Sequence, residues 1–166
     1  MREHKKQAPR RVTLGIITAS TTRTLAEDRS GHWMRKRAEK EGHTVLWHDV
    51  VPDRQALITT TVLKVVRDQQ PDAILMTGGT GISAADVTIE AVQPLFDKEL
   101  TAFGALFAQL SFEEIDAAAL LSRAAAGVIG KTVVFCMPGS LNACKLACKL
   151  LIFPELSHLV KHVCET

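Results

Sequence analysis

Hydrophobic positions along the chain form two alternating kinds of pattern. An uninterrupted apolar, β-branched run predicts a buried strand at residues 12–20, and three further strands are predicted at 44–51, 72–77 and 131–137. Between and after these runs, helical composition or spacing predicts helices at 32–41, at 54–70, from near residue 86, and at 141–153. Residues 97–129 also look helical throughout, with breaks near Gly104 and Ser111. Strands that alternate with helices of ten or more residues predict βαβ units around a mostly parallel sheet.

The loops that follow the four predicted strands contain small, hydroxyl-bearing or acidic residues. They are residues 20–31, 51–54, 77–88 and 137–141. Parallel sheets bind ligands beyond the carboxyl ends of their strands, so we expect a site where these loops converge. In the first loop, EDRSG is polar and long enough to be a mobile flap, with Arg23 and Arg29 as candidate phosphate partners.

The loop after the third strand has the sequence TGGTG. Gly78, Gly79 and Gly81 permit positive φ and let a ligand approach the backbone closely. Successive N–H groups in such a loop can form a concave anion-binding nest, to which Thr77 and Thr80 would add hydroxyl donors. A tight turn without a ligand is the alternative, but three glycines exceed what a turn needs. The loop matches neither the Walker pattern nor the GxGxxG dinucleotide pattern.

Two aspartates follow strands at the same predicted edge of the sheet. Asp86 lies at the far end of the glycine loop, and Asp53 follows the second strand. Each can be a helix N-cap, with Glu90 reinforcing Asp86. A carboxylate beside an anion nest repels phosphate unless a cation lies between them, and Mg²⁺ held by carboxylates and substrate phosphates is the usual arrangement. Together with the glycine loop, the aspartates favour a metal-assisted phosphate site.

The turn after the fourth strand has the same small-residue character. Pro138 and Gly139 shape this turn, while Ser140 provides a hydroxyl group that can cap the next helix or contact a ligand. We therefore add Pro138, Gly139 and Ser140 to the candidate site.

Cysteines and histidines provide weaker signals. Cys144 and Cys148 are four residues apart and share one face of a helix. Reduced packing thiols are favoured over a metal pair, because no histidine or carboxylate is placed to complete the pair. His32, His43 and His48 lie near loops or strands without a nucleophile at motif spacing, so we interpret them as surface or packing residues.

Length and charge suggest a simple organisation. The 166 residues suffice for one domain, which we place at residues 12–166. Residues 1–11 carry a net charge of +4 within a chain of net charge +2, and form a basic tail. We expect a poorly ordered, solvated terminus and not a nucleic-acid-binding arm, because the rest of the chain is slightly acidic and has few aromatic residues. The sequence has neither an apolar run of 18 residues nor a signal peptide, which predicts a cytoplasmic protein without membrane contact.

These motifs together resemble the MoaB/Mog family of molybdopterin-binding proteins. The matching segments are DRSG at 28–31, GHTV at 42–45, VPD at 51–53, TGGTG at 77–81, DVTIEA at 86–91 and PGS at 138–140. Residues 95–115 and 121–127 are similar to the MoaB branch in particular. The resemblance covers roughly residues 12–160.

The resemblance implies a three-layer α/β/α sandwich with a mostly parallel central sheet, assembled into homotrimers or hexamers. It implies binding of molybdopterin, a pterin dithiolene with a terminal phosphate. In the Mog branch, this phosphate attacks the α-phosphorus of ATP in a Mg²⁺-dependent adenylylation that releases pyrophosphate. The two aspartates of that chemistry fall on Asp53 and Asp86, as catalytic residues and metal ligands. The positions that would line the ligand pocket are Ser20, Thr77, Gly78, Gly79, Thr80, Gly81, Pro138, Gly139 and Ser140.

Three functions remain open at this point: a molybdopterin adenylyltransferase, a molybdopterin carrier without turnover, and a nucleotide-binding regulator that needs no pterin. Family members often have an aspartate where this chain has Thr21, and some MoaB-branch proteins lack the first catalytic aspartate. Retention of both Asp53 and Asp86 favours the enzyme. The four phenylalanines of residues 95–115 are either ordinary core or part of a subunit interface.

Overall fold

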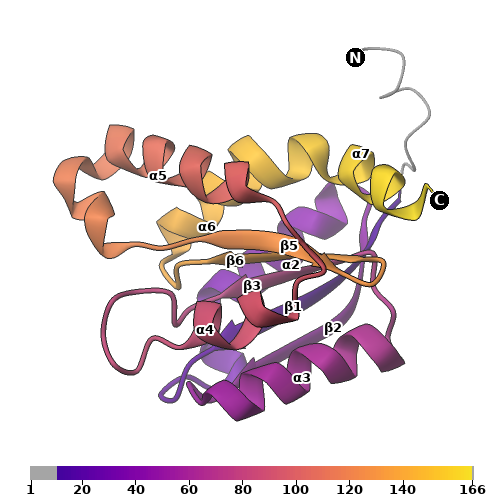
Figure 1. Ribbon diagram of the computed structural model, residues 1–166, viewed down its shortest axis with the longest axis horizontal. Helices are drawn as coiled ribbons and strands as arrows, with labels where there is room; N and C mark the ends of the chain where they lie inside the picture. The colour runs from indigo at the N-terminus through magenta and orange to yellow at the C-terminus, as the bar shows by residue number, and fades with distance from the viewer. Residues whose placement is uncertain (1–10, 166) are drawn as a thin grey trace.

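A six-stranded sheet forms the centre of the protein. The computed structural model describes residues 11–165, so the first ten residues of the expected basic tail lie outside it. The strand order is β2-β1-β3-β6-β5-β4, and Figure 1 labels all of these strands except β4. The four predicted strands are confirmed as β1 (Thr13–Ala19), β2 (Thr44–Val51), β3 (Ala73–Thr77) and β6 (Thr132–Met137), and they pair in parallel. Their carboxyl ends therefore meet at one edge of the sheet.

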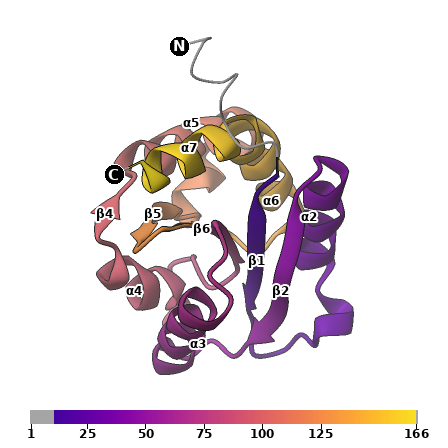
Figure 2. The same ribbon diagram turned by 90° about the vertical axis from the view of Figure 1, so that its right-hand side faces the viewer.

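Helices cover both faces of this sheet, which confirms the three-layer α/β/α sandwich (Figure 2). One face carries α2 (Arg29–Lys40), α5 (Thr101–Ile115), α6 (Leu141–Ala147) and α7 (Phe153–Cys164), with a π-helical turn at Cys148–Ile152 joining the last two. The other face carries α3 (Gln55–Asp68) and α4 (Thr88–Val92). Short 3-10 turns lie at Leu25–Glu27, Gln93–Leu95 and Asp116–Leu121.

Each face of the sheet has its own apolar core because successive side chains of a strand point to opposite sides. In β1, Leu14 and Ile16 pack with α2, α5, α6 and α7, whereas Ile17 packs with α3 and α4. Cys144 and Cys148 are buried in the first of these cores, and burial raises the pKa of both thiols. They behave as packing residues.

The prediction of continuous helix over residues 97–129 is wrong. This region contains β4 (Lys98–Glu99), an unbroken α5, a 3-10 turn and β5 (Ala125–Ile129), and β5 pairs antiparallel with both β4 and β6. Gly104 and Ser111 lie inside α5, where the missing side chain of Gly104 lets the Ala124 carbonyl approach. The sequence of β5, AAGVI, has too little β-branched character to reveal a strand; Phe96 covers its Gly127.

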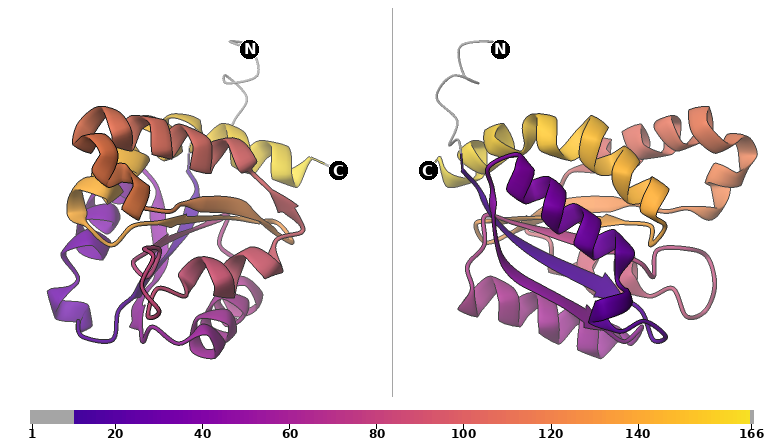
Figure 3. Two further views of the ribbon diagram at one scale, coloured as in Figure 1. Left: turned by 60° about the vertical axis from the view of Figure 1, so that its left-hand side comes forward. Right: turned by 180° about the vertical axis from the view of Figure 1, so that it is seen from behind.

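The prediction of a mobile flap at residues 27–31 is also wrong. Asp28 is fully buried and caps α2, which starts at residue 29, by accepting a hydrogen bond from the Gly31 amide (2.9 Å). Its other carboxylate oxygen accepts from the Thr18 hydroxyl (2.7 Å) and lies 2.9 Å from His48 Nε2. Although burial alone would raise the pKa of Asp28, these hydrogen bonds outweigh it and lower the pKa. The segment is therefore pinned to β1 and β2, and Figure 3 shows α2 lying against these strands.

No helix among residues 11–165 is long and apolar enough to span a membrane.

Candidate functional site

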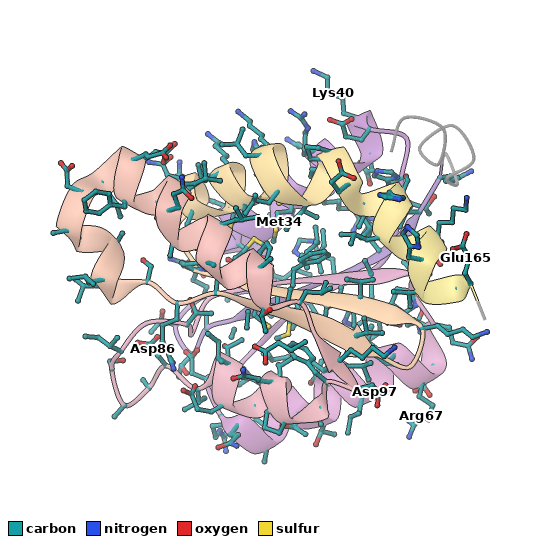
Figure 4. All side chains as sticks on the ribbon, turned by 45° about the horizontal axis from the view of Figure 1, so that its top comes forward. Met34, Lys40, Arg67, Asp86, Asp97 and Glu165 are labelled. Carbon is teal, nitrogen blue, oxygen red and sulfur yellow. The ribbon has the colours of Figure 1, made fainter. Side chains whose placement is uncertain are left out.

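A cavity of about 440 Å³ lies at the edge of the sheet where β1, β3 and β6 end. Its walls come from the loops after these strands, from Asp53 after β2, and from Leu121 and Ser122 before β5. Of the positions predicted to hold the ligand or the metal, all line this cavity except Thr77 and the candidate phosphate partner Arg29. Figure 4 labels Asp86 on the loop between β3 and α4, at the opposite end of the molecule from Glu165.

Two successive glycines give the loop after β3 its shape. Gly78 and Gly79 have φ angles of 89° and 64°, in the left-handed region that side chains disfavour. A Cβ atom on Gly78 would overlap the carbonyl oxygen of Ala19, and one on Gly79 would overlap the hydroxyl of Thr88 and lie 3.1 Å from Asp53 Oδ1. The tight path of this loop against β1 and α4 therefore requires glycine at both positions.

Backbone hydrogen bonds fix the orientation of this loop. The Gly78 amide donates to the Met137 carbonyl (3.1 Å), which ties the loop to β6. Thr88 donates from its hydroxyl to the Gly78 carbonyl (2.8 Å) and from its amide to the Gly79 carbonyl (2.9 Å). Within the described residues, the amides of Gly79 and Thr80 donate to no protein acceptor. Both residues line the cavity, so their amides are candidate donors to an anionic ligand.

Thr77 has a different position from the one the sequence suggested. Its hydroxyl is fully buried, donates to the Pro138 carbonyl (2.8 Å) and contacts Cys144 Sγ (3.0 Å). It thus joins the end of β3 to the turn after β6. Thr77 shapes the cavity wall from behind and does not face the cavity.

Asp53 is not a helix cap, because the N-cap of α3 is Arg54 and makes no side-chain cap. Its Oδ2 atom accepts hydrogen bonds from the amide (2.8 Å) and the hydroxyl (3.0 Å) of Thr21. The Thr21 hydroxyl oxygen in turn accepts from the Asp53 amide (3.1 Å). Oδ1 lies on the side of Gly79 and the cavity. An aspartate at position 21 would place a second carboxylate beside that of Asp53, in the position from which the Thr21 hydroxyl now donates a hydrogen bond to Asp53.

Asp86 is also not a helix cap, since the N-cap of α4 is Val87. Its Oδ2 atom accepts from the Ser83 hydroxyl (2.7 Å) and the Ser83 amide (2.9 Å). These hydrogen bonds from Ser83 lower the pKa of Asp86, so the side chain is a carboxylate at neutral pH. The absence of a side chain at Gly81 leaves the space this carboxylate occupies, because a Cβ there would lie 2.7 Å from Oδ2.

Sequence reasoning missed Arg123, which holds the glycine loop from outside the cavity. Its Nε donates to the carbonyls of Thr80 and Gly81 (both 3.1 Å), and its two terminal nitrogens pair with the Glu90 carboxylate. The hydrogen bond from Arg123 lowers the pKa of Glu90. With their carbonyls facing Arg123, the loop residues are held with a fixed orientation. A pattern in the sequence could not show this, because 42 or more positions separate Arg123 from the carbonyls it binds.

The two candidate arginines lie in adjoining hollows. Arg23 lines the main cavity, whereas Arg29 lines a neighbouring hollow of about 310 Å³.

The Ser30 hydroxyl donates to the Gly139 carbonyl (3.0 Å), which joins α2 to the turn after β6. Ser140 caps α6 as expected, because its hydroxyl oxygen accepts from the amide three residues on (3.2 Å). Its hydroxyl proton stays available to a ligand.

The arrangement can bind a phosphate together with a divalent cation. Free amides and Arg23 favour anionic oxygens, while Asp53 and Asp86 favour a hard cation such as Mg²⁺. Across residues 11–165, no group of three or more His, Cys, Asp or Glu side chains is placed to hold a metal. A cation bound by the two aspartates would therefore complete its coordination with water or ligand oxygens, as Mg²⁺ commonly does.

Residues 15–158 match a protein family described as "Probable molybdopterin binding domain". A protein of Bacillus subtilis named molybdenum cofactor biosynthesis protein B is 48% identical over 164 residues, with 98% of this chain and 96% of that protein covered. The similarity therefore extends over essentially the full length of both chains.

Solved structures show the same relationship. A crystal structure of a molybdenum cofactor biosynthesis protein B has a TM-score of 0.91 and 44% identity, covering 95% of this chain and 98% of the other. The structure of MoaB from Pyrococcus furiosus, described as a tungsten cofactor synthesizing protein, has a TM-score of 0.82 and 37% identity, with 95% and 100% covered.

Proposed function

The chain belongs to the MoaB family of molybdenum cofactor biosynthesis proteins, and we propose that it binds molybdopterin in the cavity at the carboxyl edge of its sheet and adenylylates it with Mg²⁺-ATP. The observation that carries this proposal is the position of Asp53 and Asp86 in one cavity with the two free amides of the glycine loop. A structural turn would need neither the unpaired amides nor two carboxylates beside them.

Molybdopterin would bind through its terminal phosphate. We assign this phosphate to the amides of Gly79 and Thr80, with the Ser140 hydroxyl as a further donor. The cavity of about 440 Å³ is in the size range of small-molecule sites. Arg23, on the same cavity, would neutralise part of the charge that two phosphate-bearing substrates bring together.

In the proposed reaction, a phosphate oxygen of molybdopterin forms a bond to the α-phosphorus of ATP. The bond from the α-phosphorus to the bridging oxygen of the β-phosphate breaks, and pyrophosphate leaves with that electron pair. The attacking phosphate is already ionised, so the chain needs no strong base; it must align the two substrates and offset their charge. Asp53 and Asp86 would hold Mg²⁺, which when bound supplies charge neutralisation between the phosphates.

One observation favours a second candidate, a molybdopterin carrier without turnover. Thr21 donates two hydrogen bonds to Oδ2 of Asp53, which leaves mainly Oδ1 for a cation. A carrier would use the same glycine loop and the same phosphate contacts. It would differ in having no requirement for Mg²⁺ or for either aspartate.

We also propose that the protein assembles with copies of itself through the end of α5 and the 3-10 turn that follows. Phe103 and Phe107 belong to the core, but Phe112, Leu120 and Leu121 are 58%, 83% and 58% exposed. Apolar side chains gathered at this level of exposure are typical of subunit interfaces. Because Leu121 also lines the cavity, a neighbouring copy would lie close to the site.

Pyrophosphate release on mixing the protein with molybdopterin, ATP and Mg²⁺ tests this proposal. An enzyme releases pyrophosphate only with the pterin present, and Asp53→Asn and Asp86→Asn each lower the rate at least tenfold. Glu39→Gln, which removes a carboxylate on α2 that pairs with Arg35, is the matched control and keeps the full rate. Binding of molybdopterin without pyrophosphate release identifies the carrier, and absence of binding refutes both.

A further inference from the structure

Four polar side chains follow one another along the exposed side of α7. His158 Nε2 and His162 Nε2 lie 2.9 Å apart, with the ring centroids separated by 4.5 Å. On the outer side of each ring, Nδ1 faces a carboxylate: His158 Nδ1 lies 3.3 Å from Glu155 Oε2, and His162 Nδ1 lies 3.3 Å from Glu165 Oε2. Lys161 approaches the other oxygen of Glu165, Oε1, at 3.5 Å. The order along the helix is thus carboxylate, imidazole, imidazole, carboxylate.

This order allows the two Nε2 atoms either to share a hydrogen bond or to bind one cation together. A neutral imidazole carries a single N–H and a single lone pair. When each Nδ1–H donates to its carboxylate, both Nε2 atoms present lone pairs to each other across 2.9 Å; in the other tautomer of one ring, its Nε2–H donates to the Nε2 of the neighbouring ring. A metal ion bound between the two Nε2 atoms uses both lone pairs and therefore selects the first of these arrangements.

The separation of the two nitrogens is suited to a metal ion. Bonds from imidazole nitrogen to a first-row metal are about 2.0–2.1 Å long, so two bonds at a right angle span about 2.9 Å and two at the tetrahedral angle about 3.4 Å. The observed 2.9 Å corresponds to the right angle. Right-angle positions are typical of Cu²⁺ and Ni²⁺, which prefer tetragonal coordination. Histidines four residues apart on a helix are also a recurrent metal-binding pair.

We propose that His158 and His162 form a two-histidine site for a divalent transition metal of tetragonal geometry, whose remaining ligands are water. Glu155 and Glu165 accept from the outer nitrogens, which keeps each Nε2 lone pair directed at the ion. The side chains of His158 and His162 are 22% and 55% exposed, so an ion reaches them directly from solvent.

This site is separate from the cavity proposed to bind molybdopterin. The end of α7 lies beside the amino ends of the strands, since Cys164 shares a hollow with Asp72 and Thr132. The cavity lies at the carboxyl ends, and Figure 4 shows Asp86 and Glu165 at opposite ends of the molecule. Metal binding by the histidine pair is therefore independent of the proposed adenylylation, and its test needs no substrate.

Calorimetric titration of the full chain with NiCl₂ tests the site. All variants carry Cys164→Ser, because this exposed thiol lies two residues from His162 and binds the same ions. The test variants are His158→Gln and His162→Gln. His32→Gln is the matched control, because it removes one histidine of α2 and leaves the histidine pair intact. Circular dichroism of each variant establishes that it is folded.

The Cys164→Ser parent is expected to bind one Ni²⁺ per chain. Either test variant lowers the affinity at least tenfold, and the control leaves it unchanged. Glu155→Gln keeps both ligands and weakens binding by about tenfold, in line with the effect of carboxylates behind metal-bound histidines. Equal affinity in a folded His158→Gln variant overturns the proposal, as does a parent that shows no saturable binding and holds only a proton between the rings.

Discussion

Gly81→Ala perturbs Asp86 without changing its charge. Gly81 has no positive φ, so alanine is compatible with its backbone, but the new Cβ would lie 2.7 Å from Asp86 Oδ2. Ordinary contact begins at 3.4 Å, so the carboxylate must move by about 0.7 Å. That movement stretches both hydrogen bonds from Ser83, which are 2.7 and 2.9 Å long. A misplacement near 1 Å in a catalytic group costs about 100-fold in rate, so we expect a loss of about 10- to 100-fold.

A measurement of the free energy of unfolding distinguishes displacement of the Asp86 carboxylate from a general loss of the folded state. Asp86 and Ser83 are not buried, so the substitution should change the free energy of unfolding by less than about 1 kcal/mol. The assay is pterin-dependent pyrophosphate release across a series of Mg²⁺ concentrations, with urea unfolding measured on the same samples. We expect a lower rate and a Mg²⁺ midpoint shifted to higher concentration. A variant with the wild-type rate and the wild-type Mg²⁺ midpoint would show that Asp86 does not hold the metal.

Three further predictions concern the surroundings of the cavity. Arg123→Gln removes the charged donor from the glycine loop and should weaken molybdopterin binding about tenfold by calorimetry while costing about 1–2 kcal/mol of stability; unchanged affinity would mean that the loop holds its shape alone. Asp28→Asn should lower the free energy of unfolding in urea by about 2–3 kcal/mol at pH 7. Because the folded pKa of Asp28 is lowered, the stabilisation by its carboxylate is present above about pH 4 and is lost as the pH falls further, so a difference that stays constant down to pH 2 would contradict this role. Leu120→Glu should reduce the mass measured by sedimentation, whereas Leu63→Glu on α3 should not; equal masses for the wild type and Leu120→Glu would place the interface elsewhere.

The parts of the fold and site that the sequence predicted are those in which local chemistry decides the structure. Three of the four parallel strands, β1, β3 and β6, are almost entirely apolar runs, and runs of this kind must be buried on both faces. The glycine loop was recognisable because Gly78 and Gly79 adopt positive φ angles, which few other residues tolerate. Its convergence with the turn at residues 138–140 followed from the parallel order of the strands alone.

The parts that the sequence did not predict depend on contacts between distant residues. β5 is a strand because it pairs with β6 and packs against Phe96, although its own residues have little strand propensity. Asp28 looked like part of a polar flap, but its partners Thr18 and His48 belong to two different strands. Asp53 and Asp86 resembled helix caps, yet Thr21 and Ser83 bind them instead, which turns them from helix ends to the cavity.

A crystal structure of the protein with molybdopterin bound would test the central proposal most directly. The proposal predicts electron density for the terminal phosphate within hydrogen-bonding distance of the Gly79 and Thr80 amides, with Asp53 and Asp86 on the same cavity. Density for the pterin at any other place on the molecule, with the glycine loop empty, would contradict it.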